Sequence, residues 1–238
     1  MLLDNYLKLR LISYISNLMS SNLVSSNLMY SNLVSSKPVS TILRKTLYCI
    51  RHGTAQHNVL YDEFGSKVFY NPKYVDTHLV DNGFRQALEL KRTWTNLKDV
   101  ELVVVSPLMR TLQTADTIFK GTNIPMIALE CVREYPMGKQ TCNKRSDKDD
   151  LLRLFPYIDF RDLQTNEDKL WDPQREETIP ELNMRINKLL SFLHSRPENV
   201  IALVNHSSFI GQFKDKEIKY LDNGQEELKH CYPYEVEL

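Results

Sequence analysis

The sequence has no excess of either charge. Its 238 residues include 30 basic and 30 acidic side chains, so the formal net charge is zero. Proteins that bind nucleic acid or membrane surfaces broadly tend to carry a strong positive charge. We therefore expect neither a nucleic-acid nor a membrane partner, although a neutral chain can still hold a local basic pocket.

Other features are missing as well. No apolar stretch approaches the roughly 18–20 residues that span a bilayer. The four cysteines form no C-x-x-C pair and no convincing secretory signal is present, so we expect reduced thiols in a cytoplasmic protein. There is no Gly-x-x-x-x-Gly-Lys phosphate loop. A cysteine phosphatase needs an arginine six residues after its cysteine, but the residues at those positions are Ala55, Met137, Lys148 and Glu237.

The first forty residues differ from the rest of the chain. Residues 16–35 read SNLMS SNLVS SNLMY SNLVS, a repeated five-residue unit without a charged side chain. A period of five matches neither the helical 3.6 nor the strand 2, so the leucines form no constant face. The repeat resembles the pentapeptide-repeat family, but four units would form only about one coil of its β-solenoid. We interpret residues 1–41 as a low-complexity tail, with a targeting segment as the alternative, and residues 42–238 as one domain.

Short apolar runs alternate with amphipathic segments after residue 42. Strands are predicted at TLYCI (46–50), VELVVV (100–105), IPMIALE (124–130) and NVIALVNH (199–206), with a closing strand near 231–237. Helices are predicted over residues 81–97, 107–119 and 179–195. This alternation favours a three-layer α/β fold, in which a largely parallel sheet has helices on both faces.

Polar side chains stand where the predicted strands end. Arg51 and His52 follow the first strand directly, and His206 ends the fourth. Arg110 and Glu134 come a few residues after the second and third. Ligands of open α/β sheets bind beyond the carboxyl ends of the strands, so these five side chains should converge on one crevice. Arginines, histidines and nearby helix N-termini suit a compact anion, above all phosphate.

Several motifs carry a family resemblance. RHGTAQHN (51–58) resembles the R-H-G-x-x-x-x-N signature of the histidine phosphatase superfamily, the phosphoglycerate mutase-like proteins. VVSPLMRTLQTA, REYPMG and VNHSSF resemble its segments with the second arginine, the glutamate and the second histidine, although Ser208 replaces the usual glycine. DTHLVDNGFRQA resembles a further segment, with Val80 where threonine is usual. The resemblance covers nearly all of residues 46–210 and implies the phosphoglycerate mutase-like fold.

The resemblance also implies roles for individual residues. His52 matches the nucleophile that becomes phosphohistidine, and Glu134 matches the proton donor to the leaving oxygen and the later base for water. The phosphate-binding positions are matched by Arg51, Asn58, Arg110 and His206. His206 would need to be cationic for this role, which a neighbouring phosphate favours. His57 matches no essential position, so we expect an ordinary loop or helix residue. Neither a metal nor another cofactor is implied.

The implied activity is hydrolysis of a phosphomonoester of a small metabolite through a phosphohistidine. The alternatives are phosphoglycerate mutase-type transfer and a phospho-ligand-binding protein without turnover. Ala55 disfavours the acid-phosphatase and phytase branch, which has a second arginine there. Segment 135–180 resembles fungal and plant phosphoglycerate mutase-like proteins more than glycolytic mutases, which favours a phosphatase. Within it, Lys144 and Arg145 are candidates to contact a substrate carboxylate or second phosphate, or else belong to a solvated mixed-charge surface. No oligomeric state is predicted.

Overall fold

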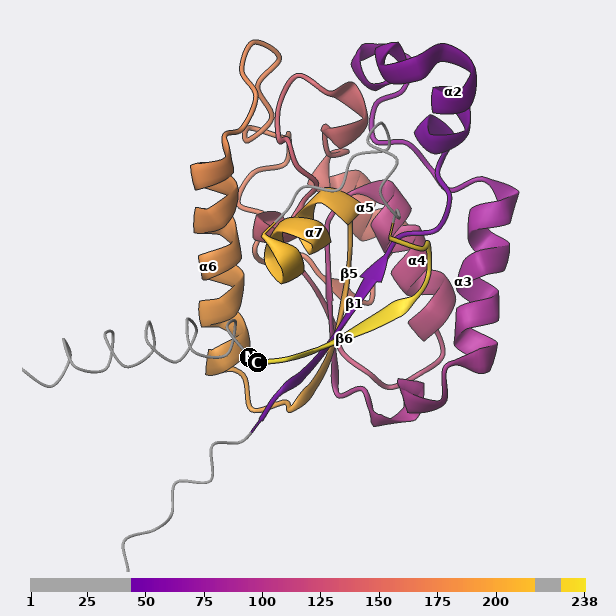
Figure 1. The fold of residues 1–238 in the computed structure, drawn as a ribbon, viewed down its shortest axis with the longest axis vertical. Helices are drawn as coiled ribbons and strands as arrows, with labels where there is room; N and C mark the ends of the chain where they lie inside the picture. Colours follow the sequence, from indigo (N-terminus) through magenta and orange to yellow (C-terminus); the bar gives the residue numbers. More distant parts are fainter. Residues whose placement is uncertain (1–43, 217–227) are drawn as a thin grey trace, which may run out of the picture. The chain divides into compact units, whose positions relative to one another are not determined.

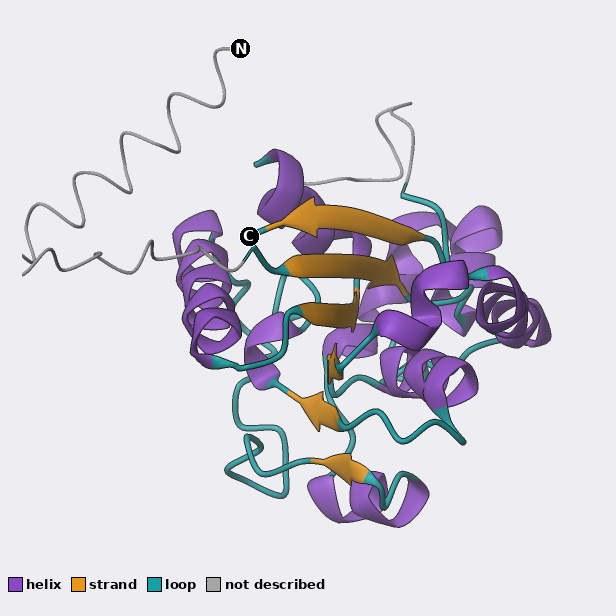
Figure 2. Ribbon diagram, turned by 90° about the horizontal axis from the view of Figure 1, so that it is seen from below, coloured by secondary structure: helices purple, strands orange, loops and turns teal. Residues whose placement is uncertain are grey.

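A six-stranded sheet forms the centre of the fold (Figure 2). This computed structural model describes residues 44–216 and 228–238, so the predicted tail, residues 1–41, lies outside the described residues. The strand order is β4-β3-β2-β5-β1-β6. The strands are β1 (Thr46–Arg51), β2 (Leu102–Val105), β3 (Met126–Ala128), β4 (Ile158–Asp159), β5 (Val200–Asn205) and β6 (Pro233–Glu237). All neighbouring pairs are parallel except β1 and β6, which are antiparallel.

Helices cover both faces of the sheet, as Figure 1 shows. The α-helices are α2 (Gln56–Phe64), α3 (Asp81–Thr93), α4 (Met109–Phe119), α5 (Lys148–Leu154), α6 (Ile179–Ser195) and α7 (Ser207–Asp215). Short 3₁₀ turns are η1 (Gly65–Tyr70), η2 (Thr95–Asp99), η3 (Glu130–Val132) and η4 (Thr141–Asn143). The predicted three-layer architecture is confirmed. No helix within the described ranges is both long and apolar enough to span a membrane.

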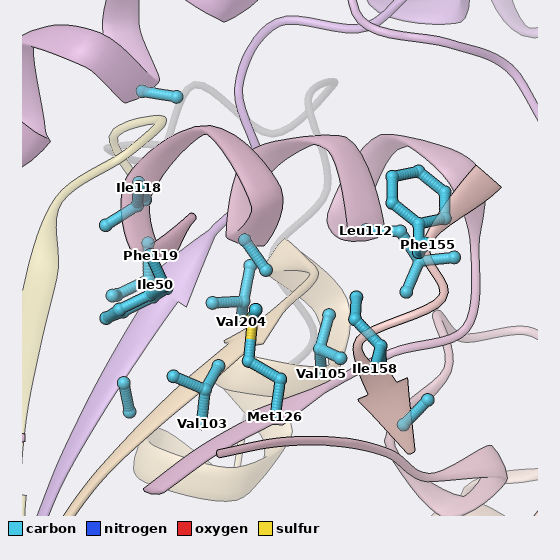
Figure 3. Close-up of a cluster of buried hydrophobic side chains, with 14 of the residues drawn as sticks. Ile50, Val103, Val105, Leu112, Ile118, Phe119, Met126, Phe155, Ile158 and Val204 are labelled. Carbon is cyan, nitrogen blue, oxygen red and sulfur yellow. The ribbon is translucent and has the colours of Figure 1, made fainter. Parts of the chain in front are cut away.

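The alternation of side chains along each strand builds two cores. Ile50 of β1 packs in a cluster with residues of α3, α4 and α5, which Figure 3 shows beneath α4. Its neighbours in the strand, Leu47 and Cys49, belong to a second cluster with residues of α6 and α7. The central strands are therefore buried on both faces, which explains why β2 reads as one continuous apolar run, LVVV.

The ends of α6 match local signals in the sequence. Thr178 is its N-cap residue, and the Glu181 carboxylate accepts hydrogen bonds from the Thr178 main-chain N–H at 2.9 Å and hydroxyl at 2.8 Å. This capping box, together with Pro180 in the first turn, specifies where the helix begins. The predicted bounds 179–195 are confirmed. By contrast, the two-residue strand β4 was not predicted, because so short a pairing leaves no periodic pattern.

Candidate active site

The two predicted site histidines lie beside each other at the carboxyl edge of the sheet. Arg51 of β1 is the register partner of Asn205 of β5, so His52 and His206 leave adjacent parallel strands at the same level. Their ring centroids are 5.2 Å apart, and both side chains are buried. Nε2 of His206 lies 2.8 Å from the hydroxyl of Ser106, which directly follows β2. The residues that follow the carboxyl ends of β1, β2 and β5 thus lie close together, as predicted.

The hydrogen bonds of His52 define its tautomer. Nδ1 lies 2.8 Å from the main-chain oxygen of Gly53, which can only accept, so Nδ1 carries the proton. Nε2 therefore carries no proton, and its lone pair accepts a hydrogen bond from Arg110 Nε–H at 3.3 Å. Burial, followed by the charges of Arg110 and other neighbours, lowers the pKa of His52 well below 6.5. The imidazole is therefore neutral at physiological pH, as a nucleophile must be.

Arg110 is held by residues of a distant turn. It lies in the first turn of α4 and is only 1% exposed. Its NH1 donates to the carbonyl of Cys142 at 2.7 Å and its NH2 donates to Oδ1 of Asn143 at 2.8 Å, both in η4. The start of α4 is held separately, because the carboxylate of Asp76 accepts from Met109 N–H at 2.7 Å and from the Ser146 N–H at 2.8 Å.

The loop after β1 packs tightly against α3. The side chain of Gln86 accepts hydrogen bonds from the main-chain N–H of Thr54 at 2.8 Å and from its hydroxyl at 3.1 Å. A Cβ atom on Gly83 would lie 2.2 Å from the Thr54 carbonyl oxygen, so only glycine permits this approach. The motif DNGFRQA therefore supports the loop that carries His52, and Thr114 of α4 completes this support by accepting from Gly53 N–H at 3.0 Å.

Glu134 lies at the side of the site next to α7. Its Oε1 accepts from the N–H of Tyr135 at 2.8 Å and from the N–H of Phe209, in the first turn of α7, at 3.3 Å. Burial raises the pKa of Glu134 above its usual value, and the charge of Arg110 and these hydrogen bonds oppose that rise. A raised pKa suits a carboxyl group that must donate a proton.

The other two predicted phosphate ligands differ from each other. Arg51 is buried at the end of β1, and its NH1 donates to the carbonyl of Leu228 at 2.8 Å. Asn58 lies in the first turn of α2, where its Oδ1 accepts from Ala55 N–H at 2.9 Å. The side-chain oxygen of Asn58 therefore caps the helix, and its contact with phosphate stays a prediction.

Within the protein alone, the surroundings of His206 disfavour the cation that a phosphate-binding role needs. Burial and the charge of Arg110 lower its pKa well below 6.5. A cationic His206 therefore requires the negative charge of a bound phosphoryl group. Its Nδ1 is buried and has no hydrogen-bond partner within the described part of the chain.

Two further histidines lie beside His52, and the motifs had assigned no role to either. His57 is a helix residue, as expected, but it is buried, with Nδ1 2.5 Å from the Thr77 hydroxyl and its ring 6.0 Å from that of His52. Nδ1 of His230 lies 2.5 Å from the main-chain oxygen of His52. The sequence offers no signal for His230, which is 178 residues away from its partner.

Both interpretations of Arg145 are wrong. The side chain is only 2% exposed. All five N–H groups of its guanidinium have acceptors: the carboxylate of Glu130 and four main-chain carbonyls, those of Ser146, Asn166, Thr165 and Glu167. None is left for a substrate, and the group is not part of a solvated surface. Lys144 instead places its ammonium 5.2 Å from the ring centre of Trp171.

Comparison with known proteins finds a matching family, similar sequences and a similar fold. The family described as histidine phosphatase superfamily (branch 1) matches residues 47–215. The chain is 34% identical over 197 residues to phosphoglycerate mutase-like protein 1 of Arabidopsis thaliana, covering 70% of this chain and 69% of the relative. It is 30% identical over 178 residues to a probable phosphatase of Schizosaccharomyces pombe, covering 71% and 77%. The solved structure of Bacillus stearothermophilus YhfR shares the fold, with 22% identity, a TM-score of 0.50 and coverage of 79% and 87%.

Proposed function

The chain belongs to branch 1 of the histidine phosphatase superfamily as a phosphoglycerate mutase-like enzyme, and on this premise we propose that it hydrolyses a phosphomonoester of a small metabolite through a phosphohistidine. The observation that carries the proposal is the environment of His52. The Nδ1 proton is held by Gly53, and the Nε2 lone pair lies 3.3 Å from a guanidinium nitrogen of Arg110. A neutral imidazole oriented in this way is a nucleophile placed next to a cationic phosphate ligand.

In the first step, Nε2 of His52 attacks phosphorus and the bond between phosphorus and the ester oxygen breaks. The electron pair of that bond passes to the leaving oxygen, which takes a proton from the Glu134 carboxyl group. The raised pKa of Glu134 favours the protonated form that this step needs. The alcohol is the first product, and the phosphoryl group stays bonded to Nε2 of His52.

In the second step, a water molecule attacks the phosphohistidine. The Glu134 carboxylate takes a proton from this water, the P–N bond breaks, and its electron pair returns to Nε2. Inorganic phosphate is released and both side chains regain their starting protonation states. Glu134 thus serves first as acid and then as base.

Arg51, Arg110, His206 and Asn58 are the proposed ligands of the phosphoryl oxygens. The two buried guanidinium groups would stabilise the charge on these oxygens in both steps. The phosphoryl group passes from the ester oxygen to Nε2 of His52 in the first step and from Nε2 to water in the second. The unpartnered Nδ1 of His206 can donate to the same group once the imidazole is cationic. Phosphate binding would favour that cation by its charge.

The test compares the wild type with His52→Ala on a panel of phosphomonoesters and on 3-phosphoglycerate, with trapping of acid-labile phosphoprotein. We expect the wild type to release phosphate, to form the labile adduct, to be inhibited by vanadate and to resist chelators. His52→Ala should lose both turnover and adduct. Wild-type turnover in His52→Ala would contradict the mechanism. Faster formation of 2-phosphoglycerate than of free phosphate would instead identify a mutase.

A further inference from the structure

Asn143 connects the phosphate clamp with a part of the chain that carries none of the reacting groups. Arg110 makes three hydrogen bonds: Nε to His52 at 3.3 Å, NH1 to the Cys142 carbonyl at 2.7 Å, and NH2 to Oδ1 of Asn143 at 2.8 Å. We propose that Asn143 is a positioning residue, whose side-chain oxygen orients the Arg110 guanidinium toward the phosphoryl group on His52. The inference rests on the proposed function and adds a residue to that site.

The donor count of Arg110 is consistent with this role. A guanidinium carries five N–H groups, and the three bonds leave two of them, one on each terminal nitrogen, for an anion. Two parallel N–H groups match two oxygens of a phosphoryl group, but only when the plane of the fork is correctly oriented. The acceptor on NH2 fixes this orientation together with the Cys142 carbonyl on NH1, because two acceptors at the end of the planar group define its plane.

Asn143 is itself held rigidly. It is 1% exposed, and its Nδ2 donates to the Pro136 carbonyl at 3.1 Å and to the Gln140 side chain at 3.2 Å. These two bonds orient the amide so that Oδ1 faces Arg110. The side chain can therefore serve as a fixed reference, which a mobile surface residue could not.

The main chain of Asn143 is also anchored. Its carbonyl accepts from NH2 of Arg133 at 2.7 Å, and Arg133 forms a two-bond pair with Asp168 at 2.9 and 2.6 Å. Both charged side chains of that pair are fully buried. The orientation of Arg110 thus depends on a buried ion pair that ties Arg133 to Asp168 of segment 135–180. Precise support of this kind is what keeps a site's ligands within the geometry that catalysis requires.

The experiment uses Asn143→Leu, which has a similar size and no acceptor. Asn143→Ser, too short to reach Arg110, is a second variant without the acceptor, in case the leucine variant does not fold. The matched control is Asn166→Leu, which removes an acceptor of the exposed Asp149 N–H in the same segment and contacts neither Arg110 nor Asn143. For each we measure kcat and KM with p-nitrophenyl phosphate, calorimetric Kd for inorganic phosphate, and Tm.

We expect Asn143→Leu and Asn143→Ser to lower kcat and weaken phosphate binding by roughly 10- to 100-fold each, because the clamp loses its orientation. Asn166→Leu should match the wild type in both quantities. A merely structural role would lower Tm and leave the phosphate Kd unchanged at temperatures where every variant is folded.

Wild-type phosphate binding in a folded Asn143→Leu or Asn143→Ser variant would overturn the inference. The proposed function fails separately, through absence of turnover or of the labile adduct in the wild type. In that case a weakened phosphate Kd in Asn143→Leu would still support the positioning role.

Discussion

Two regions of the molecule hold the site in different ways. At the carboxyl edge of the sheet, His52 and His206 are placed by strand register and main-chain hydrogen bonds. In segment 135–180, long stretches have no regular structure, and the buried Asp168 holds the chain by pairing with Arg133, which lies just before the segment. The first region carries His52, the proposed nucleophile, and the second supplies the Cys142 carbonyl and the Asn143 side chain that bond to Arg110. Regular structure thus positions His52 and His206, whereas buried polar contacts hold Arg110 beside them.

The largest expected loss of stability comes from removal of the ion pair between Arg133 and Asp168, which holds segment 135–180. Burial opposes ionisation of Asp168, but the hydrogen bonds and charge of Arg133 hold its pKa below the usual value. Asp168→Ala leaves the buried Arg133 without its main partner, so we expect a loss of about 3–5 kcal/mol in the free energy of unfolding. Urea unfolding at pH 7 measures it. The control is Glu167→Ala in an exposed pair, which should leave stability unchanged.

A smaller loss of stability should follow from a substitution at Gly83, where α3 packs against the loop after β1. A methyl group there meets the Thr54 carbonyl oxygen at 2.2 Å, so α3 and the loop after His52 must separate. We expect Gly83→Ala to lower the free energy of unfolding by roughly 1–3 kcal/mol and to lower kcat as well. The neighbouring exposed Asn82→Ala should change neither quantity. Wild-type kcat in Gly83→Ala would show that the position of this loop does not matter for catalysis.

Acid should affect the first region through its buried histidines. The pKa values of His52, His57 and His206 are all lowered well below 6.5, first by burial. Below pH 6.5 the unfolded chain therefore binds protons that the folded chain does not, and stability falls as pH falls. Each such histidine contributes up to about 1.4 kcal/mol per pH unit in that range.

His57→Gln tests this effect without changing the proposed reacting groups. The variant should lose less stability than the wild type between pH 7 and pH 5.5, by roughly 1 kcal/mol, as measured by urea unfolding at both values. Gln56→Ala, at the neighbouring exposed residue, removes no titratable group and should leave the pH dependence unchanged. An identical pH dependence in His57→Gln and the wild type would mean that His57 does not resist protonation in the folded state.

The smallest expected effect is a gain in stability from a better N-cap on α3, the helix that packs against the loop after β1. Val80 is the N-cap residue of α3 and offers no side-chain hydrogen bond. Val80→Thr has nearly the same shape and adds the acceptor, so we expect a gain of about 0.5–1 kcal/mol in the free energy of unfolding. Val80→Ala, which adds no acceptor, should give no gain. Equal stability of the threonine and alanine variants would show that the cap is not formed.

The sequence by itself determined the strands β1, β2, β3, β5 and β6 and the bounds of α6. These elements have local causes: continuous β-branched runs, a helical apolar period and a capping box. The same reasoning predicted which polar residues stand at the strand ends, because parallel strands bring their carboxyl ends to one edge.

Only the tertiary structure decided how those residues are held and protonated. Arg145 looked available for a substrate until its acceptors, up to 22 residues away in the chain, were known. His230 reaches His52 across 178 residues. His206 is neutral within the protein because burial disfavours its charge. Such properties depend on desolvation and on contacts between distant segments, whereas sequence patterns report the local periodicity of the chain.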